Sequence, residues 1–305
     1  MCSKFFQKKI TILSNDDKSF LTHRLPMAMA AKEIFGDVSV ICQNTGHFKS
    51  ILKLGFEPVD LSIEAKSFDL FYTFAIIFRL KNIYKSICPD LVYHSSVKMS
   101  FLGSIACGMA GGIPTINSIT GIGYLFSSMQ RRAIFMRWVL NPILKKLWMN
   151  SRTVMLFQNP DDRACFYNRG LSAKDAPIIK GAGIDAQKFK PVMKKKSKCI
   201  ASRTIIIGCA SRLIRDKGLE ELISAIKILE KSYKIELRLA GQSYTQNPSN
   251  FTHNDIKSWE KVRSVKLLGN ISDMVNFWQG CDIAILASHR EGLPKALLEA
   301  AACGY

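Results

Sequence analysis

Two glutamates near the end of the chain, Glu291 and Glu299, stand eight residues apart in a setting that suits ligand binding. The apolar run at 282–287 predicts a buried strand, and residues 293–302 predict a helix that tolerates Pro294 in its first turn. Parallel α/β sheets bind ligands beyond the carboxyl ends of their strands, which is where Glu291 is expected. The two carboxylates could accept hydrogen bonds from the hydroxyls of a polyhydroxylated ligand, while backbone N–H groups face its anionic part.

Two cations, Arg212 and Lys217, occupy a second loop of the same kind. They lie between a β-branched strand predicted at 204–208 and a helix predicted at 219–230. Two cations at a helix N-terminus, together with the helix dipole, stabilise a diphosphate. The pattern therefore predicts a diphosphate site, against the alternative of a solvated basic loop.

These two segments resemble a known family. Glu291-Gly-Leu-Pro-Lys-Ala-Leu-Leu-Glu299 looks like the signature of the retaining glycosyltransferases of family 4, which have the GT-B fold. The family's Arg-x4-Lys-Gly is matched by Arg212-Leu-Ile-Arg-Asp-Lys217-Gly218. The resemblance runs over most of the chain, from Lys9 to Gly304. Without it, the acids read as a solvated loop residue and a salt-bridged glutamate on a helix face.

The resemblance implies a hexosyltransferase-type enzyme. It would move a sugar from a nucleotide-sugar, in particular a UDP-sugar, to a lipid-linked saccharide during bacterial O-antigen or capsule synthesis, with retention of configuration. Arg212 and Lys217 would stabilise the departing diphosphate, Glu291 the sugar hydroxyls, and Glu299 the ribose. The donor-binding set implied is Arg212, Lys217, Gly292, Leu293, Pro294 and Glu299. No cofactor or metal is implied, and the sequence has no Asp-x-Asp cluster to hold a metal.

Strands and helices are predicted to alternate along the whole chain, which favours parallel, doubly wound sheets. Strands are expected near 10–14, 38–42, 57–59, 91–93, 115–117, 154–158, 177–180, 204–208, 235–240, 265–268 and 282–287. Helices are expected near 20–35, 49–54, 68–87, 98–110, 131–148, 160–169, 219–230 and 293–302, with a helix or surface insertion at 250–260. We expect two Rossmann-like domains, 1–190 and 203–305, joined by a basic linker at 191–202, with the active site between them. The first strand lacks a following Gly-x-Gly-x-x-Gly, which disfavours a dinucleotide oxidoreductase.

Three loops of the first half are predicted to face the acceptor: they carry His23, His94, and Thr120 with Gly121. Each follows a predicted strand, so all three should reach the same edge of the sheet. An isolated histidine is more often structural, which is the alternative for both histidines. Many relatives have a histidine where this chain has Thr120, so no catalytic histidine is carried over to that position.

Charge points to an anionic partner. The net charge is +19, and no acid occurs between Leu91 and Pro160. Residues 131–148 mix basic with aromatic and aliphatic side chains, around Pro142, which is expected to kink or split the helix. Such a helix is typical of binding to an anionic membrane surface, and the alternative is a packed surface helix. Nucleic acid is disfavoured because no recognition motif accompanies the charge.

The expected location is the cytoplasm, at the inner face of the cell membrane. The nine cysteines form no Cys-x-x-Cys pair, which suits a reducing compartment. No signal peptide is recognised, and the longest apolar run is too short to span a bilayer.

Two other functions remain open at this stage: a non-hydrolysing UDP-sugar epimerase, and an inactive membrane-surface remnant with a partial nucleotide site.

A further expectation concerns the length of the chain. Relatives continue past the position of Tyr305 with a strand, a glycine loop and helices. We therefore expect a C-terminally truncated second domain, and a product that is poorly soluble and weakly active or inactive alone.

Overall fold

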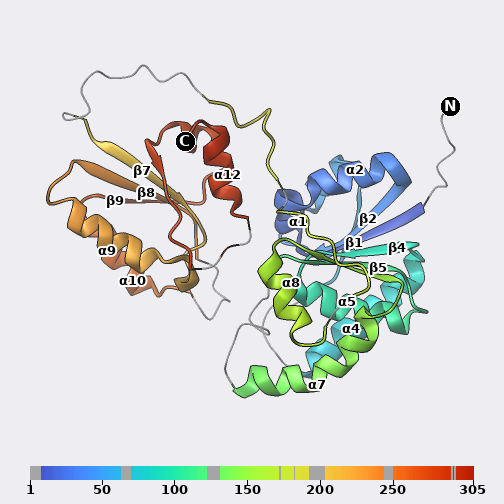
Figure 1. Ribbon diagram of the computed structural model, residues 1–305. Coiled ribbons are helices and arrows are strands. Elements are labelled where there is room, and N and C mark those ends of the chain that lie inside the picture. Colours follow the sequence, from blue (N-terminus) through green and yellow to red (C-terminus); the bar gives the residue numbers. More distant parts are fainter. Residues whose placement is uncertain are drawn as a thin grey trace. The chain divides into compact units, whose positions relative to one another are not determined.

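The computed structural model describes residues 8–62, 70–121, 131–171, 173–181, 183–191, 203–243, 250–289, 291 and 293–305 (Figure 1). The chain divides into two compact units, Met1–Ala182 and Gly183–Tyr305. The division precedes the basic stretch expected as a linker, because Ile184 and Phe189 pack in the apolar core of the second unit. Of the expected linker, 191–202, only Pro191 lies within the described residues.

The first unit is built on a six-stranded parallel sheet with the order β3-β2-β1-β4-β5-β6. Its strands are β1 (Lys8–Asp16), β2 (Gly36–Gln43), β3 (Glu57–Asp60), β4 (Leu91–His94), β5 (Thr115–Ile119) and β6 (Thr153–Phe157). The order reverses between β1 and β4, and the crevice at such a reversal is where α/β sheets bind ligands. This confirms the predicted doubly wound α/β architecture.

Helices cover both faces of this sheet (Figure 1). They are α1 (Asp17–His23), α2 (Leu25–Phe35), α3 (Phe48–Lys53), α4 (Leu70–Ile87), α5 (Val97–Met109), α7 (Arg131–Trp148) and α8 (Pro160–Tyr167). Successive side chains of a strand point to opposite faces. Ile10 and Ile12 of β1 accordingly pack with α1, α2 and α3, while Leu13 packs with α4 and α5.

The helix expected at 20–35 is two helices, α1 and α2, separated at Arg24. The cause is Pro26, which would meet the carbonyl of Thr22 in a continuous helix but fits the first turn of α2. At the break the Arg24 guanidinium donates a hydrogen bond to the Ser95 carbonyl oxygen, 3.0 Å away, just beyond β4.

Two further expectations are corrected in the first unit. The strand expected at 177–180 is absent from the described residues, where this segment forms only single bridges to β6, such as Phe157 with Ile178. Pro177 has no N–H to donate, which prevents a continuous ladder. Pro142 lies inside α7, which runs unbroken from Arg131 to Trp148, so it does not split the helix; the expected kink stays a prediction.

The second unit has a four-stranded parallel sheet with the order β10-β7-β8-β9. Its strands are β7 (Ile205–Ala210), β8 (Ile235–Ala240), β9 (Val265–Gly269) and β10 (Ile283–Ala284). Its helices are α9 (Leu219–Leu229), α10 (His253–Glu260), α11 (Met274–Gln279) and α12 (Lys295–Ala302). Ile207 and Cys209 pack with α9 and α10 on one face of the sheet, while Ile206 and Ala210 pack with α11 and α12 on the other. Figure 1 shows α9 and α10 on one side of these strands and α12 on the other. The sequence did not predict α11.

The strand predicted at 282–287 is shorter and less buried than expected. β10 contains only Ile283 and Ala284, and the Ile283 side chain is 47% exposed. β10 lies at the edge of the described sheet and pairs with β7 alone, so one of its sides has no strand to bury it. The following helix, α12, begins at Lys295, and Pro294 is its N-cap rather than a first-turn residue.

A buried polar network crosses the first unit and joins β4, β5, α4, α5 and α7. The His94 ring is fully buried, with Nδ1 2.6 Å from Asn117 Oδ1 and Nε2 3.3 Å from the Tyr84 hydroxyl. Ser104 donates to the same Asn117 oxygen and accepts from the indole N–H of Trp148. Burial lowers the pKa of His94 to about 4, and its hydrogen bond with Asn117 opposes this only in part. His94 is therefore neutral in the folded protein at pH 7.

We expect His94 to make the fold acid-sensitive. Its pKa is about 6.5 in the unfolded chain and about 4 in the folded one. The unfolded chain therefore binds more protons between these values, and stability falls as the pH falls through them. Protonation of His94 should lower the free energy of unfolding by on the order of 3 kcal/mol at pH 4, compared with neutral pH. Urea unfolding followed by near-ultraviolet circular dichroism should show a weaker pH dependence in His94→Gln than in the wild type.

His253→Gln, at an exposed position on α10, is the matched control and should keep the wild-type pH dependence. An identical slope for His94→Gln and the wild type would contradict the assignment.

Candidate active site

The loop from Ser211 to Gly218 joins β7 to α9 and carries both predicted cations. Its last turn, Arg215–Lys217, is a short 3-10 helix. Arg215 has a structural role. It forms ion pairs with Glu220 and Asp255, and its guanidinium lies over the Phe251 ring, 5.0 Å from the ring centroid. Arg215 therefore holds the loop against α9 and α10, and leaves Arg212 and Lys217 as the loop's candidates for ligand binding.

Lys217 forms an ion pair with Glu291 although the two are far apart in sequence. Both side chains are partly buried, with exposed fractions of 15% and 27%. The same two loops are also joined through their backbones, because the His289 N–H donates to the Asp216 carbonyl oxygen at 3.1 Å. Two of the residues predicted to act together, a cation and a carboxylate, thus meet directly in the structure.

Gly218 explains how the two loops approach so closely. Its φ is +63°, a left-handed conformation that L side chains rarely adopt. A Cβ at this position would lie 2.0 Å from the backbone carbonyl oxygen of Ala287. Glycine is therefore required here by its conformation and by the space available.

Glu299 lies on α12 with its side chain largely buried. The Trp278 indole N–H donates to one carboxylate oxygen at 3.4 Å, and the Lys295 ammonium is 3.7 Å from the other. Burial raises the pKa of the Glu299 carboxyl, and the Trp278 hydrogen bond and the Lys295 charge oppose that shift. Its predicted contact with a ribose is not tested by this arrangement and stays a prediction.

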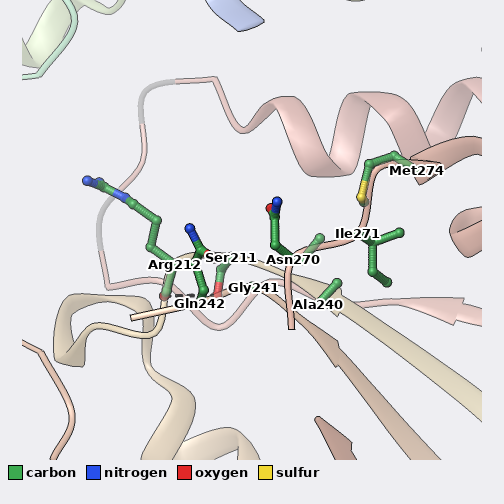
Figure 2. Close-up of a pocket in the computed structure, with 9 residues that line it drawn as sticks. Ser211, Arg212, Ala240, Gly241, Gln242, Asn270, Ile271 and Met274 are labelled. Atoms are coloured by element: carbon green, nitrogen blue, oxygen red, sulfur yellow. Dashed lines mark hydrogen bonds between the residues drawn. The ribbon is translucent and has the colours of Figure 1, made fainter. Parts of the chain in front are cut away.

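A hollow of about 170 Å³ opens at the carboxyl ends of β7, β8 and β9. Figure 2 shows that its two ends differ in character: Ile271 and Met274 lie at one end, and Arg212 and Gln242 at the other. Ser211, Gly241 and Asn270 lie between them. The hollow could thus receive a ligand with a flat apolar part and an anionic part.

Arg212 is the cation that lines this hollow. Its side chain is exposed and extends away from the apolar end (Figure 2). Among the described residues its guanidinium has no ion-pair partner. A charged group at the mouth of the hollow, with no ion-pair partner in the described part of the chain, is available to bind an anion.

Sequence reasoning missed half of this hollow, namely Gly241 and Gln242 after β8 and Asn270, Ile271 and Met274 after β9. The sequence did contain a signal for these residues. Both segments come after predicted strands, and the carboxyl ends of parallel strands lie at one edge of the sheet. These loops carry no charged residue pair, which is why they were not singled out.

The other predicted site residues fall in different places. Leu293 and Pro294 precede α12, whereas Gly292 lies outside the described residues. In the first unit, His23 is the exposed last residue of α1, and Thr120 and Gly121 follow β5 directly. His94 differs, because its fully buried ring contacts protein and presents no surface to an acceptor.

Within the described part of the chain, no group of three or more His, Cys, Asp or Glu side chains is placed to hold a metal ion. The expectation that no metal is needed stays a prediction. No described helix is both long and apolar enough to cross a membrane.

Two family models match the chain. Residues 9–159 match the model described as "Glycosyl transferase 4-like", and residues 193–305 match "Glycosyl transferases group 1". The chain is a glycosyltransferase of the GT-B fold. The predicted family and enzyme class are thereby confirmed.

Two curated relatives are bacterial enzymes with related names. The chain is 27% identical over 306 residues to the N,N'-diacetylbacillosaminyl-diphospho-undecaprenol alpha-1,3-N-acetylgalactosaminyltransferase of Campylobacter jejuni, covering 97% of this chain and 78% of the relative. It is 23% identical over 278 residues to the UDP-Gal:alpha-D-GlcNAc-diphosphoundecaprenol alpha-1,3-galactosyltransferase of Escherichia coli, covering 88% of this chain and 70% of the relative. The expectation of a truncated second domain stays a prediction.

Solved structures share the fold. Anabaena HepE in complex with UDP and glucose has a TM-score of 0.70 at 19% identity, over 97% of this chain and 79% of HepE. A sucrose-phosphate synthase from Thermosynechococcus elongatus has a TM-score of 0.72 at 16% identity, over 97% of this chain and 79% of the synthase. Both likenesses support the GT-B assignment of the fold.

Gly218→Ala should destabilise this glycosyltransferase, because the new methyl group would push the Lys217 loop away from Ala287. Gly269→Ala is the matched control: its φ is +64°, but a Cβ there meets nothing within 4 Å. Left-handed strain should cost each variant about 1–2 kcal/mol, and steric overlap should add about 1–3 kcal/mol in Gly218→Ala alone. Chemical unfolding measures the loss of stability in each variant, and equal losses in the two would refute the close approach.

Proposed function

We propose that this glycosyltransferase moves a sugar from a UDP-sugar to a lipid-linked saccharide, with retention of configuration, during the synthesis of a bacterial surface polysaccharide. The observation that carries the proposal is the meeting of Lys217 and Glu291 on two loops at one sheet edge. The same edge carries Arg212 and the hollow that Arg212 lines.

In the proposed orientation, the donor lies along this edge with its base in the hollow and its sugar at Glu291. The uracil ring would occupy the apolar end of the hollow, near Ile271 and Met274, where its flat faces lose contact with water. The diphosphate would then extend toward Arg212 and Lys217, whose charges complement it. The sugar would follow at Glu291, whose carboxylate accepts hydrogen bonds from its hydroxyls.

Chemistry at this position requires stabilisation of the leaving group. As the bond between the anomeric carbon and the phosphate oxygen breaks, its electron pair stays on the diphosphate, and Arg212 and Lys217 offset that charge. The acceptor hydroxyl oxygen forms the new bond to the anomeric carbon, and its proton passes to a phosphate oxygen of the departing diphosphate. The Lys217–Glu291 pair holds both groups in place before the donor binds, which reduces the reorganisation needed in the reaction.

The class of acceptor is supported by the relatives. The names of the Campylobacter and Escherichia enzymes both describe a saccharide attached through a diphosphate to undecaprenol. An acceptor of this class would lie in a membrane, so the enzyme has to work at the membrane surface. Because nucleotide-sugars are made in the cytoplasm, the inner face of the cell membrane is the expected location.

Helix α7 supports contact with that surface. Leu144 and Trp148 anchor one side of the helix in the core of the first unit. The other side exposes Trp138 (74%) and Ile143 (44%), together with Lys145 and Lys146. A packed helix that also presents aromatic, aliphatic and basic side chains is suited to an anionic interface. The side chains of Arg131 and Arg132 lie outside the described ones.

The function is tested by a donor screen with UDP-, GDP- and ADP-sugars, with and without an undecaprenyl diphosphate-linked saccharide. We expect transfer from a UDP-sugar only when the acceptor is present, with an anomeric configuration, read by NMR, that matches the donor. Conversion of UDP-N-acetylglucosamine in the absence of acceptor would instead identify an epimerase. Absence of both transfer and nucleotide binding would favour an inactive remnant.

Lys217→Ala should weaken UDP binding by about 10–100-fold, because one charge-assisted contact of about 1.5–3 kcal/mol is lost. Lys174→Ala is the matched control, since Lys174 is exposed in the first unit and outside the donor edge. Isothermal calorimetry with UDP measures both variants. Equal UDP affinities in the two variants would remove Lys217 from the diphosphate site.

A further inference from the structure

A second basic surface lies on the other edge of the sheet in the second unit, away from the donor hollow. The helices α9 and α10 both end there, and between their last turns lies a shallow hollow of about 610 Å³. Because α9 leads into the amino end of β8, and α10 into that of β9, this surface is at the amino edge of the sheet. The donor hollow is at the carboxyl edge.

The charge of this surface is one-sided. Four cations line the hollow: Lys227, Lys231, Lys261 and Arg263. None of them forms an ion pair with a described residue. The one acid in the lining, Glu230, accepts a hydrogen bond from the Ser264 backbone N–H at 3.3 Å. Segments 227–234 and 257–263 together contain six basic residues and only two acidic ones, Glu230 and Glu260.

Large apolar side chains are exposed among these cations. Ile228 lines the hollow and is 68% exposed, and Tyr233 in the turn after α9 is 60% exposed. The turn is fixed by the Leu229 carbonyl oxygen, which accepts from the Ser232 and Tyr233 N–H groups. Cations near the C-terminus of a helix interact favourably with the helix dipole, which could explain their position here. That effect does not explain why the side chains of Ile228 and Tyr233 are exposed to water.

We propose that this surface, formed by the ends of α9 and α10, binds the anionic headgroup layer of a lipid bilayer. Unpaired cations around a hollow attract lipid phosphates, with each basic residue near the surface contributing to the affinity. Ile228 inserts into the boundary of the acyl chains, and Tyr233 lies at the headgroup level, where its ring and hydroxyl are both satisfied.

The apolar side chains distinguish a bilayer from a soluble anion. Inorganic phosphate would use the four cations but would leave Ile228 and Tyr233 exposed. A bilayer satisfies both sets of side chains at once. The second unit thus has a membrane contact of its own, built from residues other than those of α7.

The test uses the full chain and two kinds of vesicle, phosphatidylcholine alone and phosphatidylcholine with phosphatidylglycerol. Hydrogen exchange followed by mass spectrometry gives a local readout. We expect slower exchange at 226–234 and 257–263 with the anionic vesicles, little change with the neutral ones, and no slowing with inorganic phosphate at the same ionic strength.

Variants provide the second readout. The double variant Lys231→Glu with Lys261→Glu should lose about tenfold or more in affinity for anionic vesicles. Ile228→Ser should lose less, and mainly at high salt, where the apolar contact remains. Lys174→Glu with Lys180→Glu changes the net charge equally at exposed positions elsewhere and should change the affinity less. UDP binding should be unchanged in all of them, so failure of the proposed donor site would leave this test intact.

Several results would overturn the proposal. One is slower exchange confined to the first unit, and another is an equal loss of affinity in the two charge-reversed pairs. Protection by inorganic phosphate alone would make the surface a site for soluble anions. Dimers in sedimentation runs that Ile228→Ser abolishes would assign the surface to a second copy of the chain.

Discussion

The close approach of two loops, Ser211–Gly218 after β7 and the segment after β10, is the constraint on which the donor edge depends. Gly218 has no side chain, and only for that reason can its backbone lie against the Ala287 carbonyl. The Asp216–His289 backbone hydrogen bond and the Lys217–Glu291 ion pair both rely on this contact. An ion pair between partly exposed side chains contributes little by itself. Here the contact of Gly218 with Ala287 brings together the two loops that carry the pair.

Burial separates the polar side chains of this protein into two groups. His94, Asn117, Ser104 and Trp148 are enclosed between strands and helices, where they hydrogen-bond to one another. Arg212 lies in the loop after β7 and His23 is the last residue of α1, and both are exposed. The first group ties helices to the sheet of the first unit, whereas the second lies at the surface.

The uneven charge has a corresponding physical meaning. With a net charge of +19, repulsion among the basic residues would lower the stability of the folded protein in water. In the structure, some of the cations stand beside exposed apolar side chains, on α7 and at the ends of α9 and α10. Both places are the membrane contacts proposed above, and both would suit the proposed acceptor, which would be anchored in lipid.

The sequence alone determined the fold class, the family and the elements that carry the residues of the proposed donor site. Alternating apolar periods specify βα units, and parallel strands bring their carboxyl ends to one edge, so Arg212, Lys217 and Glu291 could be assigned to that edge from spacing. Tertiary structure decided the rest. Whether a histidine after a strand faces solvent or core depends on the helices packed over it, which is why His94 is buried and His23 exposed. The hollow by Gln242 and Asn270 arises from loops adjacent only in space. The pairing of Lys217 with Glu291, 74 residues apart, needed the contact of Gly218 with Ala287, which no local pattern encodes.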